Sequence, residues 1–241
     1  MTAHQKKVDN AFADTDPDFD LGTIGPHHKL ILNKYSVVRP QFVLHTVLFE
    51  PQSSPLNESD LRAAHEVLCT LRGDYFVIFN CGVEAGASVG HKHMQILPHS
   101  TPDKFKFFPD ADTPDRSPLT VGTSDLGFTD TDGNICATPD VPFQHAFLAI
   151  PRGADASLLL QIYYCIASSL RLDLQTPHNM IMTDRWMMVI PRRQARVGIM
   201  AANASAMVGM VWVTSEQQYE AWTARDPMAW LSTFGKPANT S

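Results

Sequence analysis

Hydrophobic positions along this chain fall mostly in short runs that suit β-strands. Several runs alternate apolar with polar residues, whereas "YFVIFN" is almost continuously apolar and suits a strand buried on both faces. The pattern predicts strands at residues 29–38, 41–49, 75–80, 91–98, 142–150, 178–182, 185–192 and 207–213. Residues 183–184 are the expected turn of a C-terminal hairpin.

Other apolar residues recur at helical spacing. One helix is expected to start at Ser59–Asp60. Its apolar positions are Leu61, Ala64, Leu68 and Leu71. A second helix is expected over residues 156–174, and short helices over residues 215–232. Clustered strands with helices inserted between hairpin-like links favour an α+β fold, with a mostly antiparallel sheet and flanking helices.

The domain organisation follows from two segments without period. Residues 1–26 are rich in Asp and are expected to form a flexible N-terminal segment, with order beginning near His28. Residues 100–141, rich in Asp, Thr, Pro and Gly, are interpreted as a long surface excursion. The rest of residues 27–241 is expected to form a single domain.

Composition excludes several classes of function. The formal net charge of -6 argues against nucleic acid as a partner. No apolar run reaches the roughly 18 residues that a membrane span needs, so no membrane partner is expected. The four cysteines form no C-x-x-C pair, which predicts free thiols, a cytoplasmic location and no cysteine-based zinc site. The sequence carries no signal for an oligomeric state.

The segment Gly90–Pro98, with the pattern H-x-H-x-Q, carries the strongest chemical signal. On a strand, His91, His93 and Gln95 point to one face, and Lys92 points to the other. A loop of small residues, "CGVEAGASVG", leads directly into it. Two imidazoles and an amide on one buried face would be costly without a partner.

Three interpretations of this array compete. The histidines could be structural, or they could hold a metal ion, although Gln95 is a poor third ligand. The third interpretation is nucleophilic attack on phosphorus by His93, because a neutral imidazole is a good nucleophile near pH 7. A backbone carbonyl that accepts the proton of one ring nitrogen would leave the other bare. Gln95 can then donate to a phosphoryl oxygen, and Gly86, Ala87 and Ser88 can cradle phosphates.

Other polar residues receive plainer interpretations. His145 is expected to pack in the core, and His178 to lie at the surface. Arg192 and Arg193 are expected to be solvated, with a phosphate clamp as the alternative.

The segment "FNCGVEAGASVGHKHMQILP" resembles the active-site segment of the diadenosine tetraphosphate phosphorylases, also called ATP adenylyltransferases. These belong to the histidine-triad superfamily, near the galactose-1-phosphate uridylyltransferases. Four further blocks resemble the family in its own order: "LILNKYSVVRPQFVLHTVLFEPQ" upstream of this segment, and "PFQHAFLAIP", "HNMIMTDRWMMVIPR" and "ANASAMVGMVWV" downstream of it. The resemblance therefore runs from about residue 17 to the C-terminus and implies a histidine-triad-like sheet.

The resemblance also implies roles for the site residues. His93 matches the histidine that carries a covalent nucleotidyl group, His91 the histidine that supports it, and Gln95 the glutamine that contacts the phosphoryl group. Asn80 matches a polar position at the base of the site. The resemblance also implies that the phosphate-facing segment binds substrate. Gly86, Ser88 and Lys92 match this segment, and Ala87, which lies between Gly86 and Ser88, is expected to bind substrate with them.

The implied reaction converts diadenosine tetraphosphate and phosphate to ATP and ADP, reversibly. The implied partner is a small-molecule nucleotide: ATP, ADP or a diadenosine polyphosphate. Mg²⁺ bound to the substrate is the expected cofactor, with no metal ligands from the protein and no organic cofactor.

The sequence also departs from the family pattern. It is expected to be N-terminally shortened, without the region that holds a polyphosphate-binding lysine. Val89 replaces the usual polar residue after G-A-S, Arg193 replaces a serine, and Ala206 replaces a glycine. The alternative is therefore a divergent member that binds nucleotide without turnover, or one recruited to a different substrate.

Overall fold

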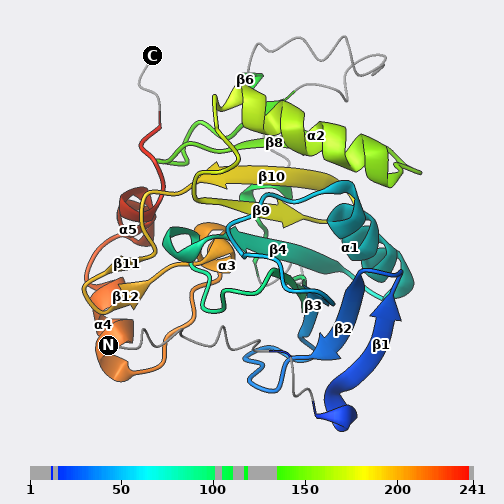
Figure 1. Cartoon of the computed structure of the whole chain (residues 1–241). Helices are drawn as coiled ribbons and strands as arrows, with labels where there is room; N and C mark the ends of the chain where they lie inside the picture. Colours follow the sequence, from blue (N-terminus) through cyan, green and yellow to red (C-terminus); the bar gives the residue numbers. More distant parts are fainter. Residues whose placement is uncertain (1–11, 13–15, 101–104, 111–116, 119–134, 239–241) are drawn as a thin grey trace, which may run out of the picture.

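A ten-stranded antiparallel sheet organises the computed structural model, which describes residues 12, 16–100, 105–110, 117–118 and 135–238 (Figure 1). The strand order is β1-β2-β3-β5-β4-β9-β10-β8-β7-β6. Its strands are β1 (Asp20–Ile24), β2 (His28–Leu32), β3 (Phe42–Thr46), β4 (Tyr75–Cys81), β5 (His93–Pro98), β6 (Ser117–Pro118), β7 (Cys136–Ala137), β8 (Ala146–Ala149), β9 (His178–Met182) and β10 (Trp186–Pro191). A separate small hairpin joins β11 (Arg196–Val197) to β12 (Met200–Ala201).

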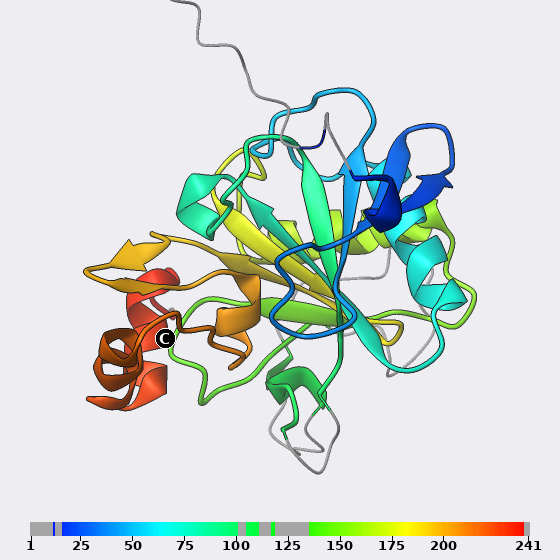
Figure 2. The same cartoon turned by 90° about the horizontal axis from the view of Figure 1, so that it is seen from below.

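The helices divide between the two sides of the sheet. They are α1 (Glu58–Thr70), α2 (Ala156–Ser169), α3 (Ala204–Met207), α4 (Glu216–Thr223) and α5 (Pro227–Phe234), with short 3-10 turns η1 (Pro17–Phe19), η2 (Val83–Ala85) and η3 (Phe108–Asp110). In both views α1 and α2 lie apart from α3, α4 and α5, which gather at the left (Figures 1 and 2). No helix among the described residues is long and apolar enough to span a membrane.

Strand parity builds two hydrophobic cores. On one side, Leu44, Val77, Met94 and Met180 pack under α1 and α2, and we call this the helix face. On the other side, Ile78, Leu97, Ile181 and Met188 pack with α3, α5 and the segments around them, and we call this the cavity face. A residue's place along a strand therefore decides which core it joins.

Local chemistry explains where the main helices begin. Asn57 caps α1 in a capping box, because its side chain accepts from the backbone N–H of Asp60 and Asp60 accepts from the backbone N–H of Asn57. Asp155 caps α2 by accepting from the N–H of Leu158. α1 begins at Glu58, one residue before the expected start.

The structure confirms the expected fold class, an antiparallel sheet with flanking helices. It corrects the last strand, expected over residues 207–213. Residues 204–207 form α3 instead, capped by Asn203, and Gly209 has a left-handed backbone with φ +96° that ends extended pairing.

The two segments without period are only partly described. Order begins before His28, because Asp20–Ile24 pairs with β2 as an edge strand and η1 precedes it. The expected flexibility of the first residues falls on 1–11 and 13–15, which lie outside the described residues. Within 100–141, β6 pairs with β7 at the other edge of the sheet. Residues 101–104, 111–116 and 119–134 lie outside the description.

Candidate active site

His93 opens strand β5 and has the ring state that a nucleophile requires. Its Nδ1–H donates to the backbone oxygen of His91 at 2.8 Å. A carbonyl can only accept, so the proton sits on Nδ1 and Nε2 keeps its lone pair. Within the described part of the chain, Nε2 has no hydrogen-bond partner. Burial lowers the pKa of His93, against the hydrogen bond to His91, and keeps the ring neutral near pH 7.

His91 supports this ring through its backbone rather than through its imidazole. Its own Nε2 shares a hydrogen bond of 2.9 Å with the hydroxyl of Thr46. β5 starts at His93, later than expected, because His91 forms only an isolated bridge with Pro51.

Gln52 fixes the backbone of His93, and sequence reasoning missed it. Its Oε1 accepts from the N–H of His93 at 2.7 Å, and its Nε2 donates to the carbonyl oxygens of His93 and Asn80. The Gln52 side chain thus supplies the backbone hydrogen bonds that a neighbouring strand would supply, at the point where β4 and β5 separate. No local pattern around Gln52 marks this role, because its partners lie 28 and 41 residues away.

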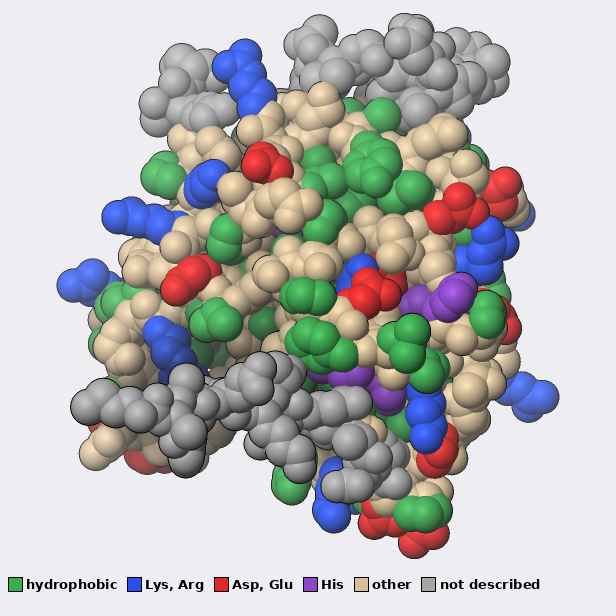
Figure 3. All heavy atoms as spheres, viewed as in Figure 1, with side chains coloured by type: hydrophobic (Ala, Val, Ile, Leu, Met, Phe, Trp, Pro, Cys, Tyr) green, Lys and Arg blue, Asp and Glu red, His purple; other side chains and the backbone are tan. Residues whose placement is uncertain are grey.

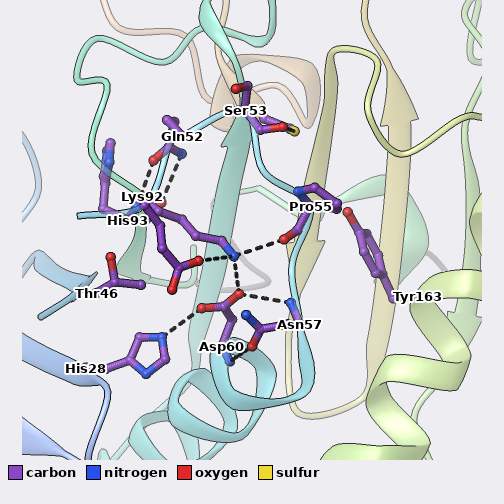
Figure 4. A network of polar contacts seen from close by, with 12 residues as sticks. His28, Thr46, Gln52, Ser53, Pro55, Asn57, Asp60, Lys92, His93 and Tyr163 are labelled. Atoms are coloured by element: carbon purple, nitrogen blue, oxygen red, sulfur yellow. Dashed lines mark hydrogen bonds and ion pairs between the residues drawn. The ribbon is translucent and has the colours of Figure 1, made fainter. Parts of the chain in front are cut away.

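Lys92 does not reach the site, and its assignment as a phosphate ligand is corrected. Strand parity sends its side chain to the helix face, where the ammonium is buried 2.5 Å from Asp60 and 3.2 Å from Glu50 (Figure 4). It also donates to the Pro55 carbonyl at 2.9 Å. Burial would raise the pKa of Asp60, but hydrogen bonds from His28 and Lys92 outweigh it and hold that pKa low. Lys92 therefore ties the strand to α1.

Gln95 lies two residues after His93 on β5, so its side chain points to the same cavity face. Its Oε1 accepts from Nε2 of Gln41 at 2.7 Å, so its own amide hydrogens point to other acceptors. Beside it opens a cavity of about 550 Å³. The cavity is also lined by Gly86, Ala87 and Ser88. The structure thus brings the predicted amide donor and the predicted phosphate loop to one hollow.

Gly86 shows why this loop needs a small residue. Its φ is +98°, and a Cβ there would lie 2.7 Å from the Cα of Asn203 and 2.9 Å from the carbonyl oxygen of Ala202. Both the backbone conformation and the space exclude a side chain. The loop is held from below by Asn179, whose Nδ2 donates to the Ala85 carbonyl at 2.8 Å.

Arg192 is neither solvated nor a phosphate clamp. It is 2% exposed, and burial lowers its pKa to about 10, so it stays charged at neutral pH. Its guanidinium donates to oxygens of five residues: Ala85, Asn179, Gln194, Ala202 and Phe234. This one side chain joins the phosphate loop to the C-terminal segments that form the far wall of the cavity.

Asn80 sits below the loop as expected, but its oxygen is used by the protein. Oδ1 accepts from Nδ2 of Asn179 and from the N–H of Ala204, both at 2.9 Å. It thereby fixes the start of α3. The structure supports a positioning role for Asn80.

His45 is a third imidazole that sequence reasoning missed. It pairs directly with His93 across β3 and β5, and its ring centroid lies 5.6 Å from that of His91. The ring of Phe12 stacks on His45 at 4.3 Å and meets His91 and His93 edge-on. On the side of the molecule that Figure 3 shows, histidine side chains lie near the middle, next to apolar side chains. Alternation along residues 41–49 is a signal that could have indicated the face of His45, but only the sheet register places it opposite His93.

The arrangement does not suit a protein-held metal ion. No group of three or more His, Cys, Asp or Glu residues in the described ranges could hold one. What it offers is a neutral imidazole on the same strand face as an amide side chain and near a loop of small residues, an arrangement whose chemistry suits transfer of a phosphorus-centred group.

Comparisons with known proteins agree with this class and narrow it. A model of the ATP adenylyltransferase C-terminal domain matches residues 139–237, and a model of the Ap4A phosphorylase N-terminal domain matches residues 1–111. Diadenosine 5',5'''-P1,P4-tetraphosphate phosphorylase 2 of Saccharomyces cerevisiae is 30% identical over 250 residues, which cover 92% of this chain and 73% of the yeast protein. The chain belongs to the Ap4A phosphorylase (ATP adenylyltransferase) family.

Other relatives and solved structures extend the match. Protein APA1 of the same yeast is 26% identical over 234 residues, 87% of this chain and 68% of that protein. The crystal structure of yeast Ap4A phosphorylase Apa2 with Ap4A has a TM-score of 0.77 at 28% identity, over 94% of this chain and 80% of that one. Its complex with AMP gives 0.74 at 29% identity, over 95% and 82%.

Acid is expected to destabilise the fold, because buried imidazoles stay neutral in it. Burial lowers the pKa values of His45, His93 and His145, and that of His178 to about 4. Below pH 6.5 the unfolded chain binds protons that the folded chain refuses, so stability falls as pH drops from about 6.5 to 4. His178 alone contributes a loss of about 3 kcal/mol over that range.

Urea unfolding at several pH values measures this effect. His178→Gln should flatten the pH dependence, whereas His27→Gln, at an exposed position, should leave it as in the native chain. The structure corrects the expected surface position of His178, because its ring is fully buried against Tyr163. If the stability of His178→Gln falls as steeply with pH as that of the native chain, this ring does not cause the acid sensitivity.

Proposed function

We propose that this chain transfers a nucleotidyl group between nucleoside polyphosphates and phosphate through a covalent adduct on His93. Diadenosine tetraphosphate and phosphate give ATP and ADP, and the reaction also runs in reverse. The observation that carries the proposal is the hydrogen bond from Nδ1 of His93 to the His91 carbonyl, because it leaves Nε2 bare.

Two displacement steps follow from that geometry. In the first, Nε2 bonds to the α-phosphorus while the bond from that phosphorus to the bridging oxygen breaks, and ATP leaves with the electron pair. In the second, an oxygen of phosphate attacks the same phosphorus, the N–P bond breaks, and ADP leaves. Gln95 donates to a non-bridging oxygen as its charge grows.

Adenine nucleotides suit the cavity. Its volume of about 550 Å³ lies in the ordinary range of small-molecule sites, about 300–1,000 Å³. Gly86–Ser88 line the end next to Gln95, and Tyr35, Val37, Val83 and Trp212 give the lining apolar and aromatic area for a base. The names of the yeast structures, which contain Ap4A and AMP, support the same ligand class.

A divalent ion is assigned to the substrate rather than to the protein. Glu84 is the carboxylate among the cavity-lining residues, and the neighbours of His93 are imidazoles and amides. This donor set does not suit Mg²⁺, which prefers several oxygen ligands. We propose that Mg²⁺ enters on the polyphosphate.

The four cysteines are free thiols, which supports the proposed cytoplasmic location.

Intact-mass analysis at neutral pH tests the proposal. The chain is incubated with diadenosine tetraphosphate without phosphate, and the expected product is a single AMP adduct together with released ATP. Adding phosphate should discharge the adduct as ADP. Tight nucleotide binding without adduct or turnover would identify a nucleotide sensor instead. If no adenine nucleotide binds, the alternative of a different substrate gains support.

Gln95→Ala is expected to lower kcat by about 10²–10³, because one donor to the developing charge is lost. Gln41→Leu removes the residue that orients this amide and should give a smaller loss in the same direction. Gln175→Ala, at an exposed position, is the matched control and should keep the native rate. Single-turnover adduct formation measures each variant, and a native rate in Gln95→Ala would reject this role.

A further inference from the structure

A row of three polar side chains crosses β2, β3 and β5 on the cavity face. Lys29 lies opposite His45 in the sheet register, and His45 lies opposite His93. Directly opposed residues on antiparallel strands have Cβ atoms about 5 Å apart. The row therefore leads from His93 on β5 across β3 and β2 toward the sheet edge at β1.

His45 has an unused polar atom in this row. Its Nδ1–H donates to the Thr46 carbonyl at 2.9 Å, which leaves Nε2 as an acceptor. Nε2 is buried and has no hydrogen-bond partner in the described part of the chain. Leaving a buried polar atom unpaired is unfavourable, and a ligand that pairs with this nitrogen would remove that cost. Phe12 stacks on the face of the ring, with the two ring centroids 4.3 Å apart.

Lys29 supplies a cation that a ligand can reach. Its ammonium lies 2.6 Å from a carboxylate oxygen of Asp20 on β1, and both side chains are about one-third exposed. Ion pairs this exposed are weak, so a polyanion can compete for the ammonium. Neither Lys29 nor His45 takes part in the adduct chemistry described above.

We propose that Lys29 and His45 form a second phosphate subsite, which holds the phosphates of the leaving nucleotide while His93 takes the nucleotidyl group. The inference rests on the proposed function, and the ligand class is the tri- or tetraphosphate chain of a nucleotide. As the bond to the bridging oxygen breaks, the electron pair stays with the leaving polyphosphate. Lys29 neutralises that charge. His45 Nε2 takes a proton from solvent and donates it as a hydrogen bond to a phosphate oxygen.

The charges around His45 explain why it takes that proton only with ligand. Lys29 faces it from β2, His93 from β5 and His91 from the segment before β5, and Asp20 is the nearby acid. Burial, then the neighbouring imidazoles and Lys29, lower the pKa of His45 against its hydrogen bond to Thr46, so the free protein holds it neutral. A bound polyphosphate adds negative charge and reverses that preference.

Calorimetry with AMP and ATP tests the subsite. A His93→Asn background prevents turnover, and the measured quantity is the ratio of the two dissociation constants. Lys29→Met and His45→Gln should each lower the preference for ATP by about 10-fold while AMP binds as before. Asp20→Asn should raise it, because Lys29 loses its competing anion. Lys236→Met makes the same charge change at a distant exposed position and should alter nothing.

Proton uptake gives a readout that a purely structural role would not move. ATP titrations in two buffers of different ionisation enthalpy should show uptake in the background variant. The part of that uptake that His45 contributes should vanish in His45→Gln. Unchanged uptake would remove His45 from the subsite.

Each outcome separates the subsite from the proposed function. An unchanged ATP-to-AMP ratio in Lys29→Met, or an equal loss for both nucleotides, overturns the subsite even if the native chain forms its adduct. A Lys29-dependent preference for ATP without any adduct keeps the subsite and rejects nucleotidyl transfer. Failure to bind either nucleotide rejects both. If His45→Gln does not fold in a thermal scan, Lys29→Met and Asp20→Asn decide, because both positions are part-exposed.

Discussion

His93→Ala is expected to form no nucleotidyl adduct and to lose at least about 10⁴-fold in turnover, as enzymes do when their nucleophile is removed. The reason is specific to one atom. Nε2 is the ring nitrogen left bare by the bond from Nδ1 to the His91 carbonyl, and alanine provides no replacement. Nucleotide binding should persist, because the cavity beside Gln95 and the loop at Gly86 are unchanged.

Chemical rescue tests whether the ring itself is the nucleophile. His93→Gly leaves a space of about one imidazole, and added imidazole should restore measurable conversion of diadenosine tetraphosphate. His145→Gln is the matched control, because that buried ring is satisfied on both nitrogens by the Phe143 carbonyl and the Thr138 N–H. It should lose stability but keep adduct formation. A His93→Ala chain that still forms an adduct would place the nucleophile elsewhere.

Breaking the buried ion pair beside the site is expected to have the second-largest effect. Asp60→Leu or Lys92→Met should each cost about 3–5 kcal/mol of unfolding free energy, because the remaining charge stays buried and keeps only its other partner, Glu50 for Lys92 or His28 for Asp60. The double variant should cost clearly less than the sum, with a coupling of about 1–3 kcal/mol. Urea unfolding of the native chain, the two single variants and the double variant measures this coupling.

The same variants should also reach the chemistry. Figure 4 shows the side chain of Lys92 reaching Asp60. Lys92 lies between His91 and His93 in the sequence, so loosening its side chain from α1 should disturb the His91 carbonyl that accepts from the ring of His93. We therefore expect kcat to fall more than KM rises. Arg62→Met removes an exposed ion pair with Glu58 on α1 and should change stability by less than about 0.5 kcal/mol. If Asp60→Leu lowers the free energy of unfolding by less than about 1 kcal/mol, the Asp60–Lys92 pair is not a major contribution to stability.

Local patterns were sufficient for the fold class and for most of the central strands. Alternation gave the central strands and the face that carries His93 and Gln95, and it turned Lys92 away from them. The same pattern failed at residues 207–213, where the cap at Asn203 and the backbone of Gly209 outweigh apolar content. Hydrophobicity alone does not distinguish a buried strand from a buried turn of helix.

Contacts between distant segments could not be predicted. Arg192 looked like a surface residue because nothing near it in sequence shows the five oxygens that surround its guanidinium. Gln52 has partners 28 and 41 residues away, and Gln41 reaches Gln95 across 54 residues. Such contacts depend on which strands become neighbours.

The sequence by itself determined the fold class, the strand that bears His93 and Gln95, and the small residues of the loop that lines the cavity beside Gln95. Those features depend on side-chain alternation and on backbone freedom at Gly86, which are local properties. Tertiary structure alone decided that the His91 carbonyl aims the ring, that Lys92 is a structural ion and that His45 stands beside His93. Sheet register sets these pairings, and register comes from the packing of the whole sheet rather than from any one strand.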